Sequence, residues 1–149
     1  MPVKAKPDGY HSITPYLVVD GAARLIAFLE EAFDAKEVER FAAPGNRVGH
    51  AEVRIGDSLV MLSDARGEHK PMQAMLYVYV DDVDATFQRA LAAGATSVQA
   101  PADQFYGDRS GGVNDPCGNL WYIATHIEDV SPVELKRRAR EAMQKAGGA

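Results

Sequence analysis

The chain has 149 residues, of which 46% are hydrophobic and 25% are charged, and it carries a net charge of -5 at pH 7. A chain of this length can bury roughly 70% of the surface that its unfolded form exposes, so one domain needs no disulfide or metal to hold its core. The negative net charge argues against nucleic acid as a partner. No stretch approaches the roughly 18 consecutive apolar residues of a membrane span, which argues against a membrane partner.

The first ten residues contain no apolar run of the length found in signal peptides. A single cysteine, Cys117, cannot form a disulfide within the chain, as is typical of proteins in a reducing compartment. We therefore expect a cytoplasmic protein. Cys117 follows Asp-Pro in a turn sequence without a nearby histidine to act as its base, so we interpret it as a turn residue and not as a nucleophile.

The first half of the chain predicts a strand, a helix and three more strands. Residues 13–19 are β-branched and aromatic and end at a turn. Apolar residues then recur at helical spacing over 22–33, and Asp20 is the expected N-cap of this helix. A Gly-Asp pair at 56–57 predicts a hairpin turn. The three further strands are predicted over 36–42, 48–55 and 59–62.

After a polar break over 64–71, the second half of the chain repeats this order of elements. A helical stripe runs from Val83 to Leu91, is capped by Asp81-Asp82, and ends at Gly94. Strands are predicted over 75–80, 96–100, 108–114 and 120–125.

The repeat predicts an α+β fold of two βαβββ modules, about 10–66 and 73–129, in one domain over 1–130. One helix covers only one face of a small sheet, so the remaining faces must be buried elsewhere. We expect the modules to form a curved mixed sheet around a cavity, either within one chain or between two chains. Small molecules would bind in that cavity.

The C-terminal segment over 131–149 predicts a helical tail. It begins with Ser131-Pro132-Val133-Glu134, a capping box with proline at the first helical position. Leu135, Ala139 and Met143 form a narrow apolar stripe beside basic residues. We expect this stripe to dock on the body of the domain or on a partner subunit.

Three motifs carry a family resemblance that extends from about Ser12 to His126. They are Val-Asp-Asp-Val-Asp over 80–84, Ala-Gly-Ala over 93–95 and Asp-Pro-Cys-Gly-Asn-Leu-Trp over 115–121. The chain thereby resembles the glyoxalase/bleomycin-resistance, or vicinal oxygen chelate (VOC), superfamily. Segments 50–58 and 103–111 are similar to the branch described as PhnB-like or 3-demethylubiquinone methyltransferase-like.

The resemblance implies metal ligands on the first and fourth strands of each module. The equivalent positions hold Thr14, Val60 or Met61, Met75 and Tyr122. None of these side chains is an imidazole, carboxylate or thiolate, so we expect no metal and no other cofactor. The same replacements remove the carboxylate base of glyoxalase I, which argues against that activity.

Strand alternation selects the candidate site residues. His50 and Glu52 share one face of their strand and are the candidate catalytic residues, as an acid/base pair or as ligands of a relocated divalent metal. A solvated strand face is the structural alternative. Tyr106 and Arg109 lie in a stretch, 103–111, typical of a closing loop. The predicted ligand-binding residues are Thr14, Tyr16, His50, Glu52, Met75, Tyr77, Tyr106, Arg109 and Tyr122.

Three functions follow from this reading. The first is a protein that binds a small apolar or aromatic molecule in the cavity between the modules, without the usual metal centre. The second is a metal-dependent VOC enzyme, a lyase, isomerase or dioxygenase, with non-standard ligands such as His50 and Glu52. The third is a folded dimer without a ligand. In each case we expect a homodimer, because the modules leave apolar sheet surface uncovered.

Overall fold

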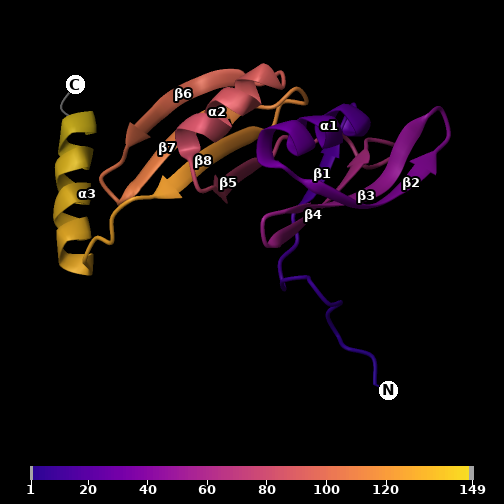
Figure 1. Ribbon diagram of the computed structural model, residues 1–149, viewed down its shortest axis with the longest axis horizontal. Coiled ribbons are helices and arrows are strands. Elements are labelled where there is room, and N and C mark those ends of the chain that lie inside the picture. The colour runs from indigo at the N-terminus through magenta and orange to yellow at the C-terminus, as the bar shows by residue number, and fades with distance from the viewer. Residues whose placement is uncertain (1, 148–149) are drawn as a thin grey trace.

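The computed structural model describes residues 2–147 and confirms the predicted order of two βαβββ modules and a C-terminal helix (Figure 1). The first module comprises β1 (Tyr16–Val19), α1 (Ala22–Phe33), β2 (Lys36–Ala43), β3 (Arg47–Ile55) and β4 (Ser58–Asp64). The second module comprises β5 (Met75–Tyr79), α2 (Val83–Ala92), β6 (Thr96–Asp103), β7 (Asp108–Asn114) and β8 (Leu120–His126). The helix α3 spans Pro132–Gly147. Residue 1 of the predicted domain and residues 148–149 of the predicted tail lie outside the described residues.

The two modules contain sheets of identical topology, with strand orders β1-β4-β3-β2 and β5-β8-β7-β6. In each sheet the first strand pairs in parallel with the fourth, which places Tyr16 beside Met61 and Tyr77 beside Tyr122. The first strand is shorter than predicted. It begins at Tyr16 because Pro15 has no N–H to donate to a strand ladder.

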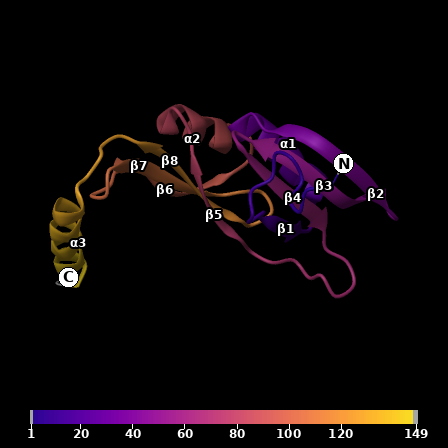
Figure 2. The ribbon, with the colours of Figure 1, turned by 90° about the horizontal axis from the view of Figure 1, so that it is seen from below.

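The helices α1 and α2 cover the same side of the curved sheets and pack against each other (Figure 2). Their apolar residues and those of the strands beneath them form one core that includes both modules. Phe33 at the end of α1 contacts Trp121 of β8, with ring centroids 5.1 Å apart. The modules therefore pack within one chain, and the side of both sheets away from the helices, called the open face below, is left without a helix.

The N-terminus of α1 is capped by Asp64 and not by Asp20, so the predicted N-cap is wrong. Asp64 Oδ1 accepts hydrogen bonds from the backbone N–H groups of Gly21 and Ala22 at 2.8 and 2.9 Å. Its Oδ2 accepts another from Val48 at 2.8 Å. The parallel pairing of β1 with β4 places Asp64 beside the end of β1, where α1 begins.

The second helix begins as predicted, since Asp82 accepts a hydrogen bond from the Ala85 N–H. A second buried aspartate, Asp115, organises the turn before β8. It accepts hydrogen bonds from the Asn119 side chain at 3.0 Å and from the Trp121 indole at 2.8 Å. This turn therefore orients Trp121 in the core shared by the two modules. Cys117 is a half-buried residue of the same turn, as predicted.

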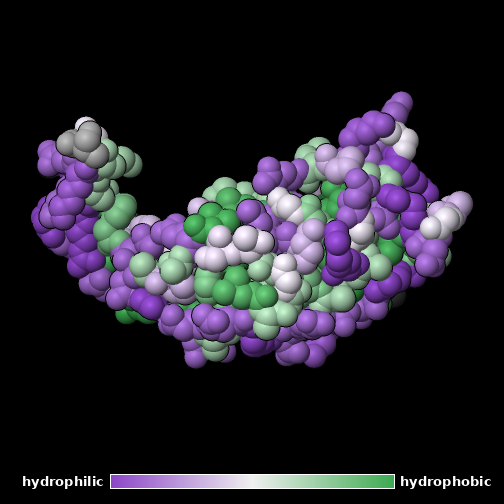
Figure 3. Space-filling model, turned by 90° about the horizontal axis from the view of Figure 1, so that it is seen from above, coloured by the Kyte–Doolittle hydropathy of each residue, from purple (hydrophilic) through white to green (hydrophobic). Residues whose placement is uncertain are grey.

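The tail helix α3 begins with the predicted cap, in which Ser131 Oγ accepts a hydrogen bond from the Glu134 N–H. None of its residues in the described part of the chain is buried. Arg138 joins it to the body through Glu128 and the Phe105 carbonyl. Of the apolar stripe, Leu135 and Ala139 are half-buried and Met143 is 73% exposed, so the stripe is covered only in part within one chain. In Figure 3 the apolar atoms of the tail, in green, line the side toward the body. Within residues 2–147 no helix is long and apolar enough to cross a membrane.

Candidate functional site

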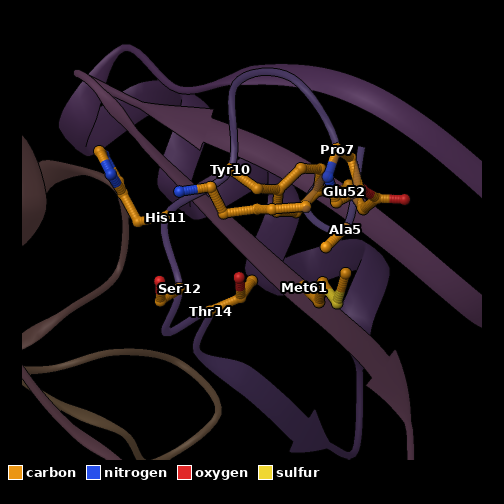
Figure 4. A pocket seen from close by; sticks show the side chains of 9 residues that line it. Ala5, Pro7, Tyr10, His11, Ser12, Thr14, Glu52 and Met61 are labelled. Carbon is orange, nitrogen blue, oxygen red and sulfur yellow. The ribbon is translucent and has the colours of Figure 1, made fainter. Parts of the chain in front are cut away.

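The open face of the first module forms one wall of a cavity of about 690 Å³. Thr14, Glu52 and Met61 line it from the sheet side. Figure 4 shows Pro7 and Tyr10 of the N-terminal segment across from Thr14 and Met61. The other lining residues also come from that segment: Ala5, Lys6, His11 and Ser12. The N-terminal segment therefore lies over part of the open face and bounds a wide cavity there.

A chain of hydrogen bonds connects three predicted site residues on the same face. The Tyr16 hydroxyl lies 3.1 Å from His50 Nδ1, and His50 Nε2 lies 3.3 Å from Glu52 Oε2. The Phe41 ring is stacked on His50 at 6.4 Å between centroids. Imidazole between a hydroxyl and a carboxylate can pass a proton from one to the other. Glu52 brings one end of this chain to the cavity.

The side chains at the positions of the family's metal ligands do not fit a divalent metal. The structure selects Met61 over Val60, because Met61 lines the cavity and Val60 is buried in the core. Met61 and Thr14 offer a thioether and a hydroxyl, which are poor replacements for imidazole or carboxylate. Within residues 2–147 no group of three or more His, Cys, Asp or Glu side chains has a suitable arrangement for a metal ion.

The open face of the second module carries a different cluster, centred on Asp108. The hydroxyls of Tyr77 and Tyr79 donate hydrogen bonds to Asp108 Oδ2 at 2.7 and 2.8 Å. His126 Nδ1 lies 2.9 Å from Asp108 Oδ1, and its Nε2 lies 2.7 Å from Asp129. Asp108 is 3% exposed, so its carboxylate is buried beneath these partners. The cluster is therefore a buried negative charge covered by aromatic rings.

The protonation of this cluster follows from its contacts. Burial acts to raise the pKa of Asp108, but hydrogen bonds from His126, Tyr77 and Tyr79 outweigh it and lower the pKa below its ordinary value. Hydrogen bonds to Asp108 and Asp129 raise the pKa of His126. Burial, the Tyr106 hydroxyl and Asp108 raise the pKa of Tyr77. The carboxylate is thus charged and the tyrosines are neutral hydrogen-bond donors at neutral pH.

Tyr122 and Met75 extend the same face. The rings of Tyr122 and Tyr77 are nearly parallel, with centroids 6.4 Å apart. Tyr122 packs closely over Gly112, where an added Cβ would lie 3.1 Å from the ring. Met75 is one of the most exposed large apolar residues of the strands. The glycine in β7 therefore leaves room for an aromatic ring to lie across the sheet.

Arg109 does not belong to either cluster, which corrects its expected place over the cavity. Its guanidinium contacts Asp84 of α2 at 2.9 and 3.0 Å and Asp103 at 3.0 Å. The expected closing loop is for the most part strand, since β7 begins at Asp108. Side chains alternate along a strand, so Arg109 points to the helix side while Asp108 points to the open face.

The predicted site residues thus form two groups on two sheets. The first group contains Thr14, Tyr16, His50 and Glu52, and the second contains Met75, Tyr77, Tyr106 and Tyr122. The sequence alone did not indicate the N-terminal wall of the cavity or the central position of Asp108 and His126 in the second cluster. Alternation over 108–114 could have identified Asp108, because it assigns the residue to the face opposite the buried Val113.

The fold defines the class of protein, and comparison with known families agrees. The model of the Glyoxalase/Bleomycin resistance protein/Dioxygenase superfamily matches residues 9–123. The chain therefore belongs to this superfamily, as the resemblance of its motifs implied.

Three individual proteins are similar to this chain. The Mycobacterium tuberculosis protein Rv0887c is 40% identical over 136 residues, which cover 84% of this chain and 80% of that protein. The crystal structure of TioX from Micromonospora sp. ML1 is 29% identical with a TM-score of 0.66 and covers 78% of this chain and 99% of its own. A PhnB protein from Bacillus cereus has the same fold at 19% identity and a TM-score of 0.59, over 77% of this chain and 99% of its own.

Proposed function

We propose that the protein binds a small apolar or aromatic molecule in the cavity of the first module, without the metal centre usual in its superfamily. The observation that carries the proposal is the cavity of about 690 Å³ over Thr14, Glu52 and Met61. Pockets for small molecules typically measure about 300–1,000 Å³ and combine apolar walls with a few polar groups. The thioether of Met61 and the ring of Tyr10 supply apolar contact, and Glu52 and Thr14 supply hydrogen-bonding groups.

We expected the ligand site between the two modules, whereas this cavity lies between the sheet of the first module and the N-terminal segment. The wall opposite the sheet is the N-terminal segment, whose residues are mostly exposed. Such a segment can adapt to ligands of different shape, because few buried contacts hold it. Methionine also adapts its shape to its partners. Both features support binding of a hydrophobic molecule over recognition of one rigid substrate.

Fluorescence of N-phenyl-1-naphthylamine, a neutral aromatic probe, tests this proposal. We expect saturable enhancement with the wild-type protein and at least about tenfold weaker binding to Met61→Trp, because the indole fills space that the probe needs. Met143→Trp, at an exposed position on α3, is the matched control and should bind as the wild type does. Equal binding by Met61→Trp and the wild type would refute the proposed site.

The hydrogen-bonded chain Tyr16–His50–Glu52 supports a second candidate, an enzyme that uses Glu52 and His50 for proton transfer. For the metal-dependent form of this candidate, the residues over 2–147 offer His50 and Glu52 as two donors, and further ligands would come from substrate or water. Glu52→Gln separates the two functions, since it removes the base and leaves the shape of the cavity intact. If Glu52→Gln still binds the probe but loses a catalytic activity that the wild-type protein shows, the result favours the enzyme.

We also propose that the chain belongs to the PhnB-like branch of the superfamily. The support is the similarity of segments 50–58 and 103–111 to that branch. The fold of the Bacillus cereus PhnB protein is compatible with it.

A further inference from the structure

A second part of the open face offers chemistry that the proposed function does not use. Tyr77, Tyr79 and Tyr122, called the tyrosine face below, lie on adjacent strands of the second module. Tyr77 is 42% exposed and Tyr79 is 62% exposed, although both are large aromatic residues. Apolar or aromatic side chains that gather on a surface commonly mark a binding site.

The hydroxyl groups of this face are already committed. Tyr77 and Tyr79 both donate their hydroxyl hydrogens to the same oxygen of buried Asp108. What remains for a ligand is the π-system of each ring and the lone pairs of each hydroxyl oxygen. Both attract positive charge, and donation to a carboxylate makes the rings more electron-rich.

The residues around the tyrosine face also favour a cation, because their net charge is negative. Asp108 and Asp129 contribute two carboxylates, and His126 between them contributes at most one positive charge. The cluster is therefore net negative in either protonation state of His126. A cavity of about 350 Å³ lies along the edge strand β5, where Tyr77 and Tyr79 line it together with core-side residues such as Leu76 and Trp121, and Asp57 of the β3–β4 turn is the charged residue among those described in its lining.

We propose that the tyrosine face binds an organic cation, of the class of a quaternary or tertiary ammonium group, through cation–π contact with Tyr77 and Tyr79. An anion would meet two carboxylates here, and a neutral apolar molecule would gain nothing from them. An inorganic cation would give up its hydration shell for two neutral hydroxyl oxygens and ring faces, which is a poor exchange. This site is separate from the first-module cavity and does not depend on the function proposed for it.

Choline and its neutral carbon analogue, in which a tert-butyl group replaces the trimethylammonium group, test the proposal with the full-length protein. Amide NMR spectra follow each titration. We expect saturable shifts in β5 and β8 with choline, and affinity for the neutral analogue weaker by about fivefold or more. Tyr79→Leu should weaken choline binding by about threefold or more, whereas Tyr79→Phe, which keeps the ring, should retain most of it.

Phe41→Leu is the matched control, because Phe41 is an aromatic residue of similar exposure on the other module. It should leave choline binding unchanged. Four results would overturn the proposal: equal affinity for the neutral analogue, no saturable shift up to about 50 mM choline, no effect of Tyr79→Leu, or loss of choline binding in Phe41→Leu. Shifts of the same amides with protein concentration alone would also overturn it, since a second copy of the chain would then cover the face.

Discussion

Replacing Asp64 by alanine tests whether this residue caps the N-terminus of α1. The substitution removes the acceptor for three backbone N–H groups, those of Gly21, Ala22 and Val48. Loss of an N-cap costs about 0.5–2 kcal/mol, and each buried donor left without a charged partner costs about 1–3 kcal/mol. Gly21 and Ala22 can be hydrated at the helix end, but Val48 is buried. We therefore expect the free energy of unfolding to fall by about 3–5 kcal/mol for Asp64→Ala.

Thermal unfolding followed by circular dichroism measures this effect. In a domain of this size each kcal/mol lowers the melting temperature by about 2–4 °C, so a decrease of roughly 10 °C is expected. Asp20→Ala is the matched control, because the Asp20 side chain is exposed and contacts Arg47 at 3.4 Å. Its effect should stay below about 0.5 kcal/mol. An Asp20→Ala variant that melts as low as Asp64→Ala would refute the capping by Asp64.

The pH dependence of stability gives an independent check on Asp64. Burial acts to raise the pKa of Asp64, but the N–H groups of Ala22, Val48 and Gly21 and the charge of Arg47 outweigh it, so the pKa is below the ordinary value. A lowered pKa in the folded state means that the stabilisation is fully present above the unfolded pKa of about 3.9 and is lost as the pH falls through the folded value. Asp64→Asn should therefore lose less stability than the wild type below about pH 4.

Three further predictions concern assembly, metal content and the Asp108 cluster. Sedimentation equilibrium at micromolar concentration should return a homodimer, because the first module exposes the apolar side chains of Val38 and Phe41 outside the tyrosine face, and a mass near 16.1 kDa, that of one chain, would contradict this. Metal analysis of protein purified without chelators should find far less than one equivalent of Zn, Ni, Mn or Fe per chain, whereas a stoichiometric amount would favour the enzyme with ligands at His50 and Glu52. NMR titration should give His126 a pKa above 6.5, lowered by Asp129→Asn. The stabilisation from His126 is present below its unfolded pKa and is lost as the pH rises through the folded value.

Local sequence patterns predicted the elements well where burial on one side determines the period. The predicted helix over 22–33 and the predicted strand over 108–114 have the same ends in the structure. In α1 the residues at helical spacing, Leu25, Ile26 and Leu29, are all buried. In β7 the chain is held between two neighbouring strands. The sequence of α1 thus records its burial, which is the information that periodicity uses, whereas β7 contains a single large apolar residue, Val113, and shows no such period.

The cap of α1 could not be predicted in this way. Asp20 has the residue type and position of an N-cap, and Asp64 lies more than forty residues further along the chain. Only the parallel pairing of β1 with β4 brings Asp64 to the helix end. The Asp64 carboxylate accepts from Gly21 and Ala22, and the side chain of Asp20 contacts Arg47 at the surface instead. Contacts between strands distant in sequence thus override a local signal that is chemically sound.

The candidate site residues were predicted as one set but form two groups in the structure. The reason is again an arrangement of elements that local sequence does not encode. Alternation assigns a side chain to a face of its strand, but it does not say which of two sheets will lie opposite that face. Within one chain α1 packs beside α2, so the open faces of the two modules lie side by side and Glu52 and Tyr77 belong to separate surfaces. Residues on such surfaces can meet only across an interface between two chains. Within one chain the first-module cavity and the tyrosine face are therefore two separate sites.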